Sequence, residues 1–422
     1  MTKDSSLTRI LRNVLGTAAF QRLWGDGLQT AQDDPVALGR LLLSTRGEVS
    51  GQAIADRMLS LIEATDADGF AQFCQALRDG FEVDAEKVIA AAVAARSGSA
   101  VALEALQRAA EPPRQELFRR LNAAPHGTAR LVRFRERLLT AQRADTSLAP
   151  LDADLRHLLR SWFNRGFLVP TRIDWHTPAA LLEKIIAHEA VHAIDTWDDL
   201  RRRLAPPDRR CFAFFHPAMP DEPLIFVEVA LTRGLATSIQ DVLDSARPVI
   251  APDEADTAIF YSISNCQAGL AGISFGAFLI KQVAADLRAE VPGLKVFATL
   301  SPVPGFAAWT AAQGLEADAL RADPDLLQDA ASTYLLTAKD AGGRPLDPVA
   351  RFHLGNGAEL HRINPDGNLS PKGLAQSHGV MVNYLYDLDQ VEARHEAHAA
   401  SGEIAANRAV RARLSRKVPP RP

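Results

Sequence analysis

The sequence predicts an α+β protein of two parts, an all-helical bundle over residues 1–165 followed by a mixed α/β domain over residues 166–422. The first part is rich in Ala, Leu, Arg, Glu and Gln, and its apolar residues recur three and four positions apart, which is helical spacing. The second part holds short β-branched and aromatic runs bounded by Pro, Gly, Asp and Asn, which are typical of strands. A chain of 422 residues also exceeds what one hydrophobic core usually serves.

The helical part is illustrated by the segment that begins near residue 151. Acidic residues in its first turn favour a helix start, and Gly166 is placed to end it. Its apolar stripe is formed by Leu151, Leu155, Leu158, Leu159 and Trp162, and a second stripe by Leu131, Phe134 and Leu138. Because short breaks separate several such segments, and because no cluster of ligand-type residues occurs among them, we expect an antiparallel bundle that serves as a scaffold or oligomerisation domain.

The second part is expected to contain a strand–helix–strand crossover unit. The helix lies between the runs AIFYSIS and KVFATLS, and Pro292 and Gly293 end it. Its buried face is predicted to consist of Leu279, Ile280, Val283 and Leu287. Further strands are predicted at CFAFF, LIFVEVAL and VMVNYLY. Because a crossover of this kind joins parallel strands, the domain is predicted to pack helices on a mixed sheet.

Composition and charge exclude several classes of protein. Lys and Arg total 47 against 51 Asp and Glu, a net charge of −4, which disfavours a polybasic nucleic-acid binder. The three cysteines are odd in number and far apart, so we expect no disulfide framework and a reducing cytoplasm. No apolar run approaches the roughly 20 residues that span a bilayer. We therefore expect a soluble cytoplasmic protein that binds neither nucleic acid nor membrane.

The motif HEAVH, residues 188–192, matches the zincin pattern H-E-x-x-H. On a helix, His188 and His192 would share a face and could hold zinc, with Glu189 as general base. The following sequence supplies no third histidine at the right spacing and no clear glutamate partner. We therefore favour a polar helix face over a metal site.

The turn from Gly269 to Ala277 is a candidate phosphate site. It leads from a predicted strand into the crossover helix, where unpaired N–H groups and the positive end of the helix dipole favour an anion. Neither the P-loop pattern nor the dinucleotide pattern fits these residues, and turn geometry alone also explains the glycines. A different phosphate-bearing ligand is the functional alternative.

Ser301 and His353 form the third candidate site. Ser301, in LSPVPGF, follows a predicted strand and lies among prolines and a glycine that stiffen the backbone, while His353, in RFHLGNG, could supply a proton near neutral pH. Each also has an ordinary structural explanation, as a turn former and as a buried, hydrogen-bonded imidazole. Spacing alone leaves His216, His361 and His378 as alternatives for the acid.

Five stretches together resemble the signature regions of malonyl-CoA decarboxylases, in matching order and spacing from about Trp162 to Leu388. The resemblance implies a helical domain joined to a GCN5-related N-acetyltransferase-like (GNAT) catalytic domain. The stretches are HPAMPDEPLIFVEVALT, AIFYSISNCQAGLAGISFGAFLIKQV, FATLSPVPGF, FHLGNGAELHRIN and SHGVMVNYLYDL.

The resemblance also implies site residues. Ser301 and His353 match the catalytic pair, and Ser262 and Tyr386 match positions that line the substrate pocket. The turn that holds the CoA pyrophosphate corresponds to Ala271, Gly272, Ile273, Ser274, Phe275, Gly276 and Ala277.

The activity implied is that of a carboxy-lyase of fatty acid metabolism, which converts malonyl-CoA to acetyl-CoA and CO2. We expect no metal or other cofactor, since the thioester itself accepts the electron pair. We also expect a homo-oligomer, with a tetramer as one option. An acyl-CoA-dependent N-acyltransferase on the same fold is the nearest alternative, and a zinc peptidase and a non-catalytic acyl-CoA sensor are weaker ones.

Overall fold

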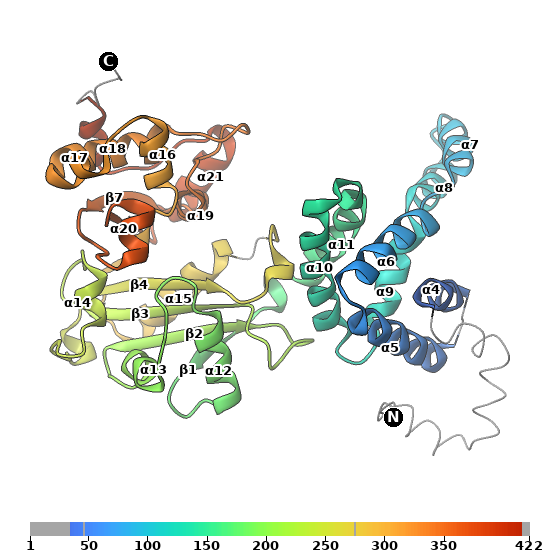
Figure 1. The fold of residues 1–422 in the computed structure, drawn as a ribbon, viewed down its shortest axis with the longest axis horizontal. Coiled ribbons are helices and arrows are strands. Elements are labelled where there is room, and N and C mark those ends of the chain that lie inside the picture. Colours follow the sequence, from blue (N-terminus) through green and yellow to red (C-terminus); the bar gives the residue numbers. More distant parts are fainter. Residues whose placement is uncertain (1–33, 45–46, 274–275, 416–422) are drawn as a thin grey trace. The chain divides into compact units, whose positions relative to one another are not determined.

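The computed structural model describes residues 34–44, 47–273 and 276–415 (Figure 1). The chain divides into two compact units. The first contains the chain up to Asn164 together with Pro217–Pro220 and Gln267–Ile273, and the second contains the remainder. A helical unit followed by a unit built on a mixed sheet confirms the predicted fold class. Among the described residues, no helix is both long enough and apolar enough to cross a membrane.

The first unit is a bundle of helices (Figure 1), and the residues buried within it are mostly apolar. Phe134 lies at its centre, with the rings of Phe70, Phe73 and Phe118 edge-on around it at centroid distances of 5.1, 6.3 and 5.9 Å. The helices are α4 (Pro35–Ser44), α5 (Glu48–Ala64), α6 (Ala67–Gly80), α7 (Ala85–Ala95), α8 (Ala100–Ala110), α9 (Pro113–Asn122), α10 (Gly127–Ala144) and α11 (Ala149–Trp162).

The predicted stripe on α11 is confirmed for its four leucines, which are buried, while Trp162 is half-buried. Helix α11 ends at Trp162 rather than at Gly166, because Phe163 leaves helical geometry (φ −101°, ψ 41°) and buries its ring. The predicted stripe on α10 is confirmed in full, since Leu131, Phe134 and Leu138 are all buried.

Helices α7 and α8 form a hairpin that extends away from the rest of the first unit (Figure 1). Neither helix has a buried residue. The hairpin nevertheless carries four exposed large apolar side chains, Ile89, Val93, Val101 and Leu103, with exposed fractions from 48% to 73%. Core packing therefore does not account for its apolar character.

The second unit is built on an eight-stranded sheet in the order β1-β2-β3-β4-β5-β8-β6, with β7 also paired to β8. All pairs are antiparallel except β4 and β5, which are parallel and are joined by the predicted crossover helix α15 (Gly276–Glu290). The strands are β1 (Val169–Ile173), β2 (Arg209–Phe215), β3 (Ile225–Thr232), β4 (Thr257–Asn265), β5 (Val296–Thr299), β6 (Ser301–Pro302), β7 (Glu359–Asn364) and β8 (Met381–Leu385).

Helices complete the second unit. Apolar residues of α12 (Ala179–His188) and α13 (Trp197–Leu204) share a core cluster with β1, β2 and β3, and α14 (Ile239–Leu243) packs against β3, β4 and β5. The predicted buried face of α15 is confirmed. The C-terminal helices are α16 (Phe306–Ala312), α17 (Ala317–Ala322), α18 (Pro324–Thr337), α19 (Pro348–Gly355), α20 (Pro371–Ser377), α21 (Val391–Ser401) and α22 (Arg408–Ala412).

Candidate active site

Ser301 lies where the two parallel strands of the sheet separate. Pairing of β4 with β5 ends at Phe260 and Thr299, and one further backbone bond joins Leu300 N to Phe260 O at 3.0 Å. The chain then continues into β6, where Ser301 pairs with Val382 of β8. Ser301, directly after this separation, is held by its pairing with β8 and also lines a pocket.

His353 is presented by the short helix α19. Asp347 caps the start of this helix by accepting hydrogen bonds from Val349 N and Ala350 N, both at 2.9 Å, and Pro348 occupies the first turn. These features fix the helix and place His353 in its last turn. Nε2 of His353 lies 3.1 Å from Oγ of Ser301, and both side chains are buried. The structure therefore brings the two sequence-predicted residues together.

Three further residues surround the pair. Ser301 Oγ donates to Oγ1 of Thr299 at 2.7 Å. Nδ1 of His353 lies 2.8 Å from the Tyr386 hydroxyl, and the ring of Tyr384 stacks on the imidazole with centroids 4.6 Å apart. Each hydrogen-bonding atom of the pair thus has a partner, and the imidazole is fixed in position on both nitrogens and on one face.

Burial controls the protonation of these groups. It lowers the pKa of His353 from 6.5 to about 3, because a charged imidazolium would lose its hydration. Burial likewise raises the pKa of the Tyr384 and Tyr386 hydroxyls well above 10. At neutral pH the imidazole is therefore uncharged and both phenols keep their protons.

Ser301 and His353 open onto a pocket of about 300 Å³ in the second unit. Its wall is mostly apolar and is contributed by β4, by the segment after β5, by α19 and by the loop after α12. The apolar lining residues include Val191, Phe260, Ile263, Leu300, Val349 and Phe352. Tyr261 and Asn265 also line it, and a few polar groups in a concave, mostly apolar wall are the usual arrangement of a small-molecule site.

The other two residues implied to line the pocket lie behind its surface. Ser262 is buried on β4 and donates to Oε2 of Glu189 at 2.7 Å, and Tyr386 reaches the site through His353. Neither is among the residues that line the pocket. Their contact with a substrate stays a prediction.

The implied CoA turn is described in part. Arg135 of α10 donates to the carbonyls of Gly269 and Ala271 at 2.7 and 2.8 Å, and Gly272 adopts a φ of +74°. Ser274 and Phe275 lie outside the described residues, and Gly276 begins α15. Pyrophosphate binding by Ala271, Gly272, Ile273, Ser274, Phe275, Gly276 and Ala277 stays a prediction.

The helical interpretation of HEAVH is wrong. His188 is the last residue of α12, Glu189 is its C-cap with extended backbone, and His192 lies in the loop beyond. The Glu189 carboxylate accepts from the backbone N–H groups of Val191 and His192 at 2.8 and 2.7 Å, which turns the chain out of the helix. The histidines therefore do not share a helix face. Across the described ranges, no group of three or more His, Cys, Asp or Glu side chains is arranged to hold a metal ion.

The alternative histidines for the acid lie elsewhere. His361 on β7 pairs with Glu359 at 3.0 Å, and Nε2 of His378 bonds to Thr310 Oγ1 at 2.8 Å. The ring of His216 lies 6.0 Å from that of Phe167. Of the four histidines considered, His353 is the one that lines the pocket.

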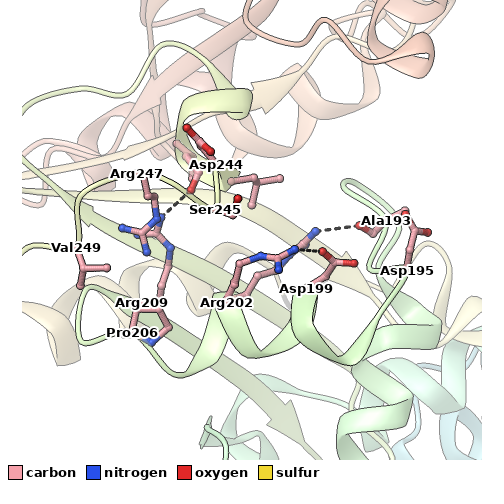
Figure 2. Close-up of a pocket in the computed structure, with 13 residues that line it drawn as sticks. Ala193, Asp195, Asp199, Arg202, Pro206, Arg209, Asp244, Ser245, Arg247 and Val249 are labelled. Carbon is pink, nitrogen blue, oxygen red and sulfur yellow. Dashed lines mark hydrogen bonds and ion pairs between the residues drawn. The ribbon is translucent and has the colours of Figure 1, made fainter.

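A second pocket of about 250 Å³ lies beside α13 and α14 and is lined by four arginines (Figure 2). Arg203 pairs with Glu228 at 3.0 Å, Arg247 pairs with Asp208, and Arg202 pairs with Asp199. Arg209 donates to the backbone carbonyls of Asp208 and Val242. Because acidic residues compensate the arginines, the pocket is an ion-paired cleft rather than a basic one.

Sequence reasoning missed Thr299 and Tyr384. A signal existed for Thr299, because residues two apart on an extended chain point to the same side, and Thr299 precedes Ser301 by two positions. Tyr384 contacts His353 through the pairing of β8, which no local pattern in the sequence shows.

The structure defines a two-part enzyme with an α/β catalytic unit. Its features are a helical unit, a mixed sheet and a buried serine–histidine pair in an apolar pocket. The sequence matches the family model of the malonyl-CoA decarboxylase C-terminal domain over residues 166–325 and 315–421, and that of the N-terminal domain over residues 81–163. The chain belongs to the malonyl-CoA decarboxylase family.

Relatives named malonyl-CoA decarboxylase are similar in sequence to this chain over most of their length. The mitochondrial malonyl-CoA decarboxylase of Anser anser anser is 34% identical over 348 residues, covering 71% of this chain and 69% of the relative. That of Mus musculus is 34% identical over 360 residues, covering 73% of each. An alignment that covers this share of the chain includes residues of both units.

Solved structures of malonyl-CoA decarboxylases show the same fold. Those from Rhodopseudomonas palustris and Agrobacterium vitis are each 52% identical with a TM-score of 0.85, covering 90% of this chain and 99% of theirs. The one from Cupriavidus metallidurans is 36% identical with a TM-score of 0.72, covering 91% of this chain and 100% of its own.

Proposed function

We propose that this protein converts malonyl-CoA to acetyl-CoA and CO2, with Ser301 and His353 as its catalytic residues. The observation that carries this proposal is the 3.1 Å contact between Ser301 Oγ and His353 Nε2 at the wall of an apolar pocket, in a chain of this family. Malonyl-CoA is a carboxylate two bonds from a thioester carbonyl, and such a pocket suits its acyl end.

The reaction moves one electron pair. The bond between the carboxyl carbon and C2 breaks, its electrons form the C1–C2 double bond of a thioester enolate, and the carboxylate leaves as CO2. C2 of the enolate then takes one proton, which gives the methyl group of acetyl-CoA. One proton is consumed per turnover and no other reactant is required, so we propose a reaction without metal or prosthetic group.

The pocket lowers the barrier in two ways. Its apolar wall, which includes Val191 and Phe352, removes water from the carboxylate, and the departing charge then spreads into the thioester. Ser301 lies at the same wall and would hydrogen-bond the malonyl group and the oxygen where charge develops. His353 would give the proton to C2, which is general acid catalysis. No covalent intermediate is needed.

The nucleotide end of the substrate would be held by the turn from Ala271 to Ala277. Helix α15 begins at Gly276 and runs for 15 residues, so the positive end of its dipole lies at this turn, and the first N–H groups of a helix have no acceptor within it. A pyrophosphate is a suitable ligand for such a terminus. In this arrangement Ser262 and Tyr386 support the acyl end from behind the pocket wall.

The test is incubation of the purified protein with malonyl-CoA and no acceptor, with CO2 and acetyl-CoA measured together. We expect both products in equal amounts and full activity in the presence of EDTA. Acyl transfer that appears only after an amine is added would replace this proposal with the acyltransferase. Binding without turnover would replace it with the sensor, and activity restored by zinc after EDTA would point to a metal enzyme.

We further propose that the hairpin of α7 and α8 binds a second copy of this chain, which makes the protein a homo-oligomer. The hairpin has no buried residue and carries four exposed large apolar side chains, so a partner that covers it would bury apolar surface that the rest of the chain leaves exposed. A second copy is present wherever the chain is and offers the same apolar surface.

The setting proposed is the cytoplasm, in fatty acid metabolism. Cys74, Cys211 and Cys266 are all free thiols buried in the fold, which is compatible with a reducing compartment. Fractionation of cells that express the protein, together with acyl-CoA profiles with and without it, tests both parts.

A further inference from the structure

The hydrogen bonds around His353 form a chain whose direction can be worked out from the number of protons available. Ser301 has one hydroxyl proton, and it is donated to Thr299 Oγ1 at 2.7 Å. The Ser301 oxygen therefore has no proton left for His353, which lies 3.1 Å away. The contact between them requires a proton on Nε2 of the imidazole.

Thr299 accepts a second hydrogen bond, from the backbone. The backbone N–H of Tyr384 donates to the same Oγ1 at 3.2 Å, and the threonine side chain is fully buried in β5. This N–H occupies one lone pair of Oγ1, and the Ser301 hydroxyl donates to the other. The threonine side chain thus accepts two hydrogen bonds at this point.

The other imidazole nitrogen completes the chain. If Nε2 carries the proton of a neutral imidazole, Nδ1 is an acceptor, and the Tyr386 hydroxyl at 2.8 Å is the group that donates to it. The order of donation is then Tyr386 to His353, His353 to Ser301, and Ser301 to Thr299. A malonyl oxygen that takes the Ser301 proton in place of Thr299 leaves the first two donations unchanged, because Ser301 still has no proton for His353. A serine that is activated as a nucleophile requires the opposite order, with Ser301 donating to Nε2 and the imidazole proton on Nδ1.

We propose that Thr299 is a positioning residue that fixes the neutral His353 as its Nε2–H tautomer, so that the imidazole proton lies on the Ser301 side, where the substrate carbon is to be protonated. This inference rests on the proposed decarboxylation, because a proton donor needs its proton on that side whereas a general base for Ser301 does not. It also explains why a second hydroxyl lies buried beside the catalytic serine.

The test is nitrogen-15 NMR of histidine-labelled protein at neutral pH, which distinguishes protonated from unprotonated ring nitrogens. For the unaltered protein we expect His353 to show a protonated Nε2 and an unprotonated Nδ1. Thr299→Ser retains the accepting oxygen and should give the same spectrum. Thr299→Val removes it, so that Ser301 can turn its proton to Nε2, and the Nδ1–H tautomer should appear.

Kinetics supply a second readout. A general acid typically contributes about 10² to 10⁴-fold, so we expect Thr299→Val to lower kcat by about 10-fold or more with KM nearly unchanged, and Thr299→Ser to restore most of it. Thr310→Val is the matched control, because Thr310 is also a buried threonine with a side-chain hydrogen bond, in its case to His378, and it lies outside the pocket lining. It should leave kcat unchanged.

The outcomes separate this inference from the proposed function. A protonated Nδ1 in the unaltered protein would overturn the inference even if Thr299→Val failed to fold, and so would a Thr299→Val spectrum identical to that of the unaltered protein. Either result would leave decarboxylation standing. Absence of CO2 release from malonyl-CoA would instead remove the proposed function, whatever the tautomer.

Discussion

The Ser301 hydroxyl oxygen lies 3.1 Å from Nε2 of His353, although 52 residues separate the two in the chain. Strand β8 holds both halves of the pair, because Val382 pairs with Ser301 and Tyr384 stacks on the imidazole. Alternate residues of one short strand thus set both components of the site. The arrangement is rigid, since each of these side chains is buried.

Replacement of His353 by Asn should abolish most of the activity. The variant has no imidazole to protonate C2, so we expect turnover to fall by at least about 10²-fold while CoA binding remains nearly intact. The measurements are CO2 release and the dissociation constant for CoA. His378→Asn is the control, because His378 is also a buried histidine bonded to a hydroxyl, outside the pocket lining. An unchanged rate in His353→Asn would remove His353 from the mechanism.

The effect on kcat of replacing Ser301 by Ala should depend on whether His353 is present. Because the two side chains are in direct contact, their effects on kcat should not add, and the double variant should be about as impaired as the worse single variant. A double-variant cycle on kcat measures this directly. Fully multiplicative losses would show that the two residues act independently.

The strands and the crossover unit could be predicted from the sequence because their signals are local. Runs such as CFAFF and AIFYSIS combine β-branched and aromatic residues with clear boundaries, and both are strands in the structure. Strand β6 has only two residues and β1 is mostly exposed, so neither carries a strong pattern. Pairing of β8 with both β5 and β6 depends on distant residues.

The HEAVH motif shows why a matching pattern misled. The five residues satisfy the zinc-binding spacing only if the helix continues through them, and α12 ends at His188. The Glu189 side chain ends the helix. It accepts hydrogen bonds from the N–H groups of Val191 and His192 in the loop and from the hydroxyl of Ser262 on β4. The last of these partners is 73 residues away, so a local motif does not contain it.

Two histidines that are buried in their neutral form should each contribute a loss of stability in mild acid. The buried Glu228, whose pKa burial raises from 4.5 to about 7, contributes in the opposite direction. Burial lowers the pKa of His353 and His192 from 6.5 to about 3. Below pH 6.5 the unfolded chain therefore binds more protons at these two histidines than the folded chain, and the stabilising contribution present above pH 6.5 is lost as the pH falls towards 3. Each histidine should cost about 2 kcal/mol of unfolding free energy at pH 5.

Denaturant unfolding at pH 7.5 and pH 5 measures this effect. His353→Asn removes one of the two groups, so its unfolding free energy should drop by about 2 kcal/mol less over the same interval. The comparison uses the change with pH within each protein, so a general destabilisation by the substitution does not affect it. Equal drops in both proteins would show that His353 is not the neutral buried group described.

Charged residues on the α7–α8 hairpin should disrupt the proposed oligomer without unfolding the chain. Ile89 and Val93 are 64% and 63% exposed and support no core, so Ile89→Glu with Val93→Glu should lower the mass in sedimentation equilibrium and leave Tm nearly unchanged. Val49→Glu, at a residue of α5 that is 53% exposed, is the control. An unchanged mass would place the oligomer contact elsewhere.

Gly269 should tolerate no side chain, because the backbone of α10 lies directly against it. A Cβ at this position would lie 1.9 Å from the carbonyl oxygen of Val132, and that atom belongs to the backbone of a helix and cannot move alone. Gly269→Ala should therefore lower the unfolding free energy by about 2–4 kcal/mol. Gly51→Ala is the matched control in the same unit, since Gly51 lies inside α5 and its nearest neighbour would be a leucine methyl at 3.8 Å. That control should be neutral or slightly stabilising, as alanine is favoured over glycine within a helix. If urea unfolding gave both variants the same free energy, the close approach of this segment to α10 would be contradicted.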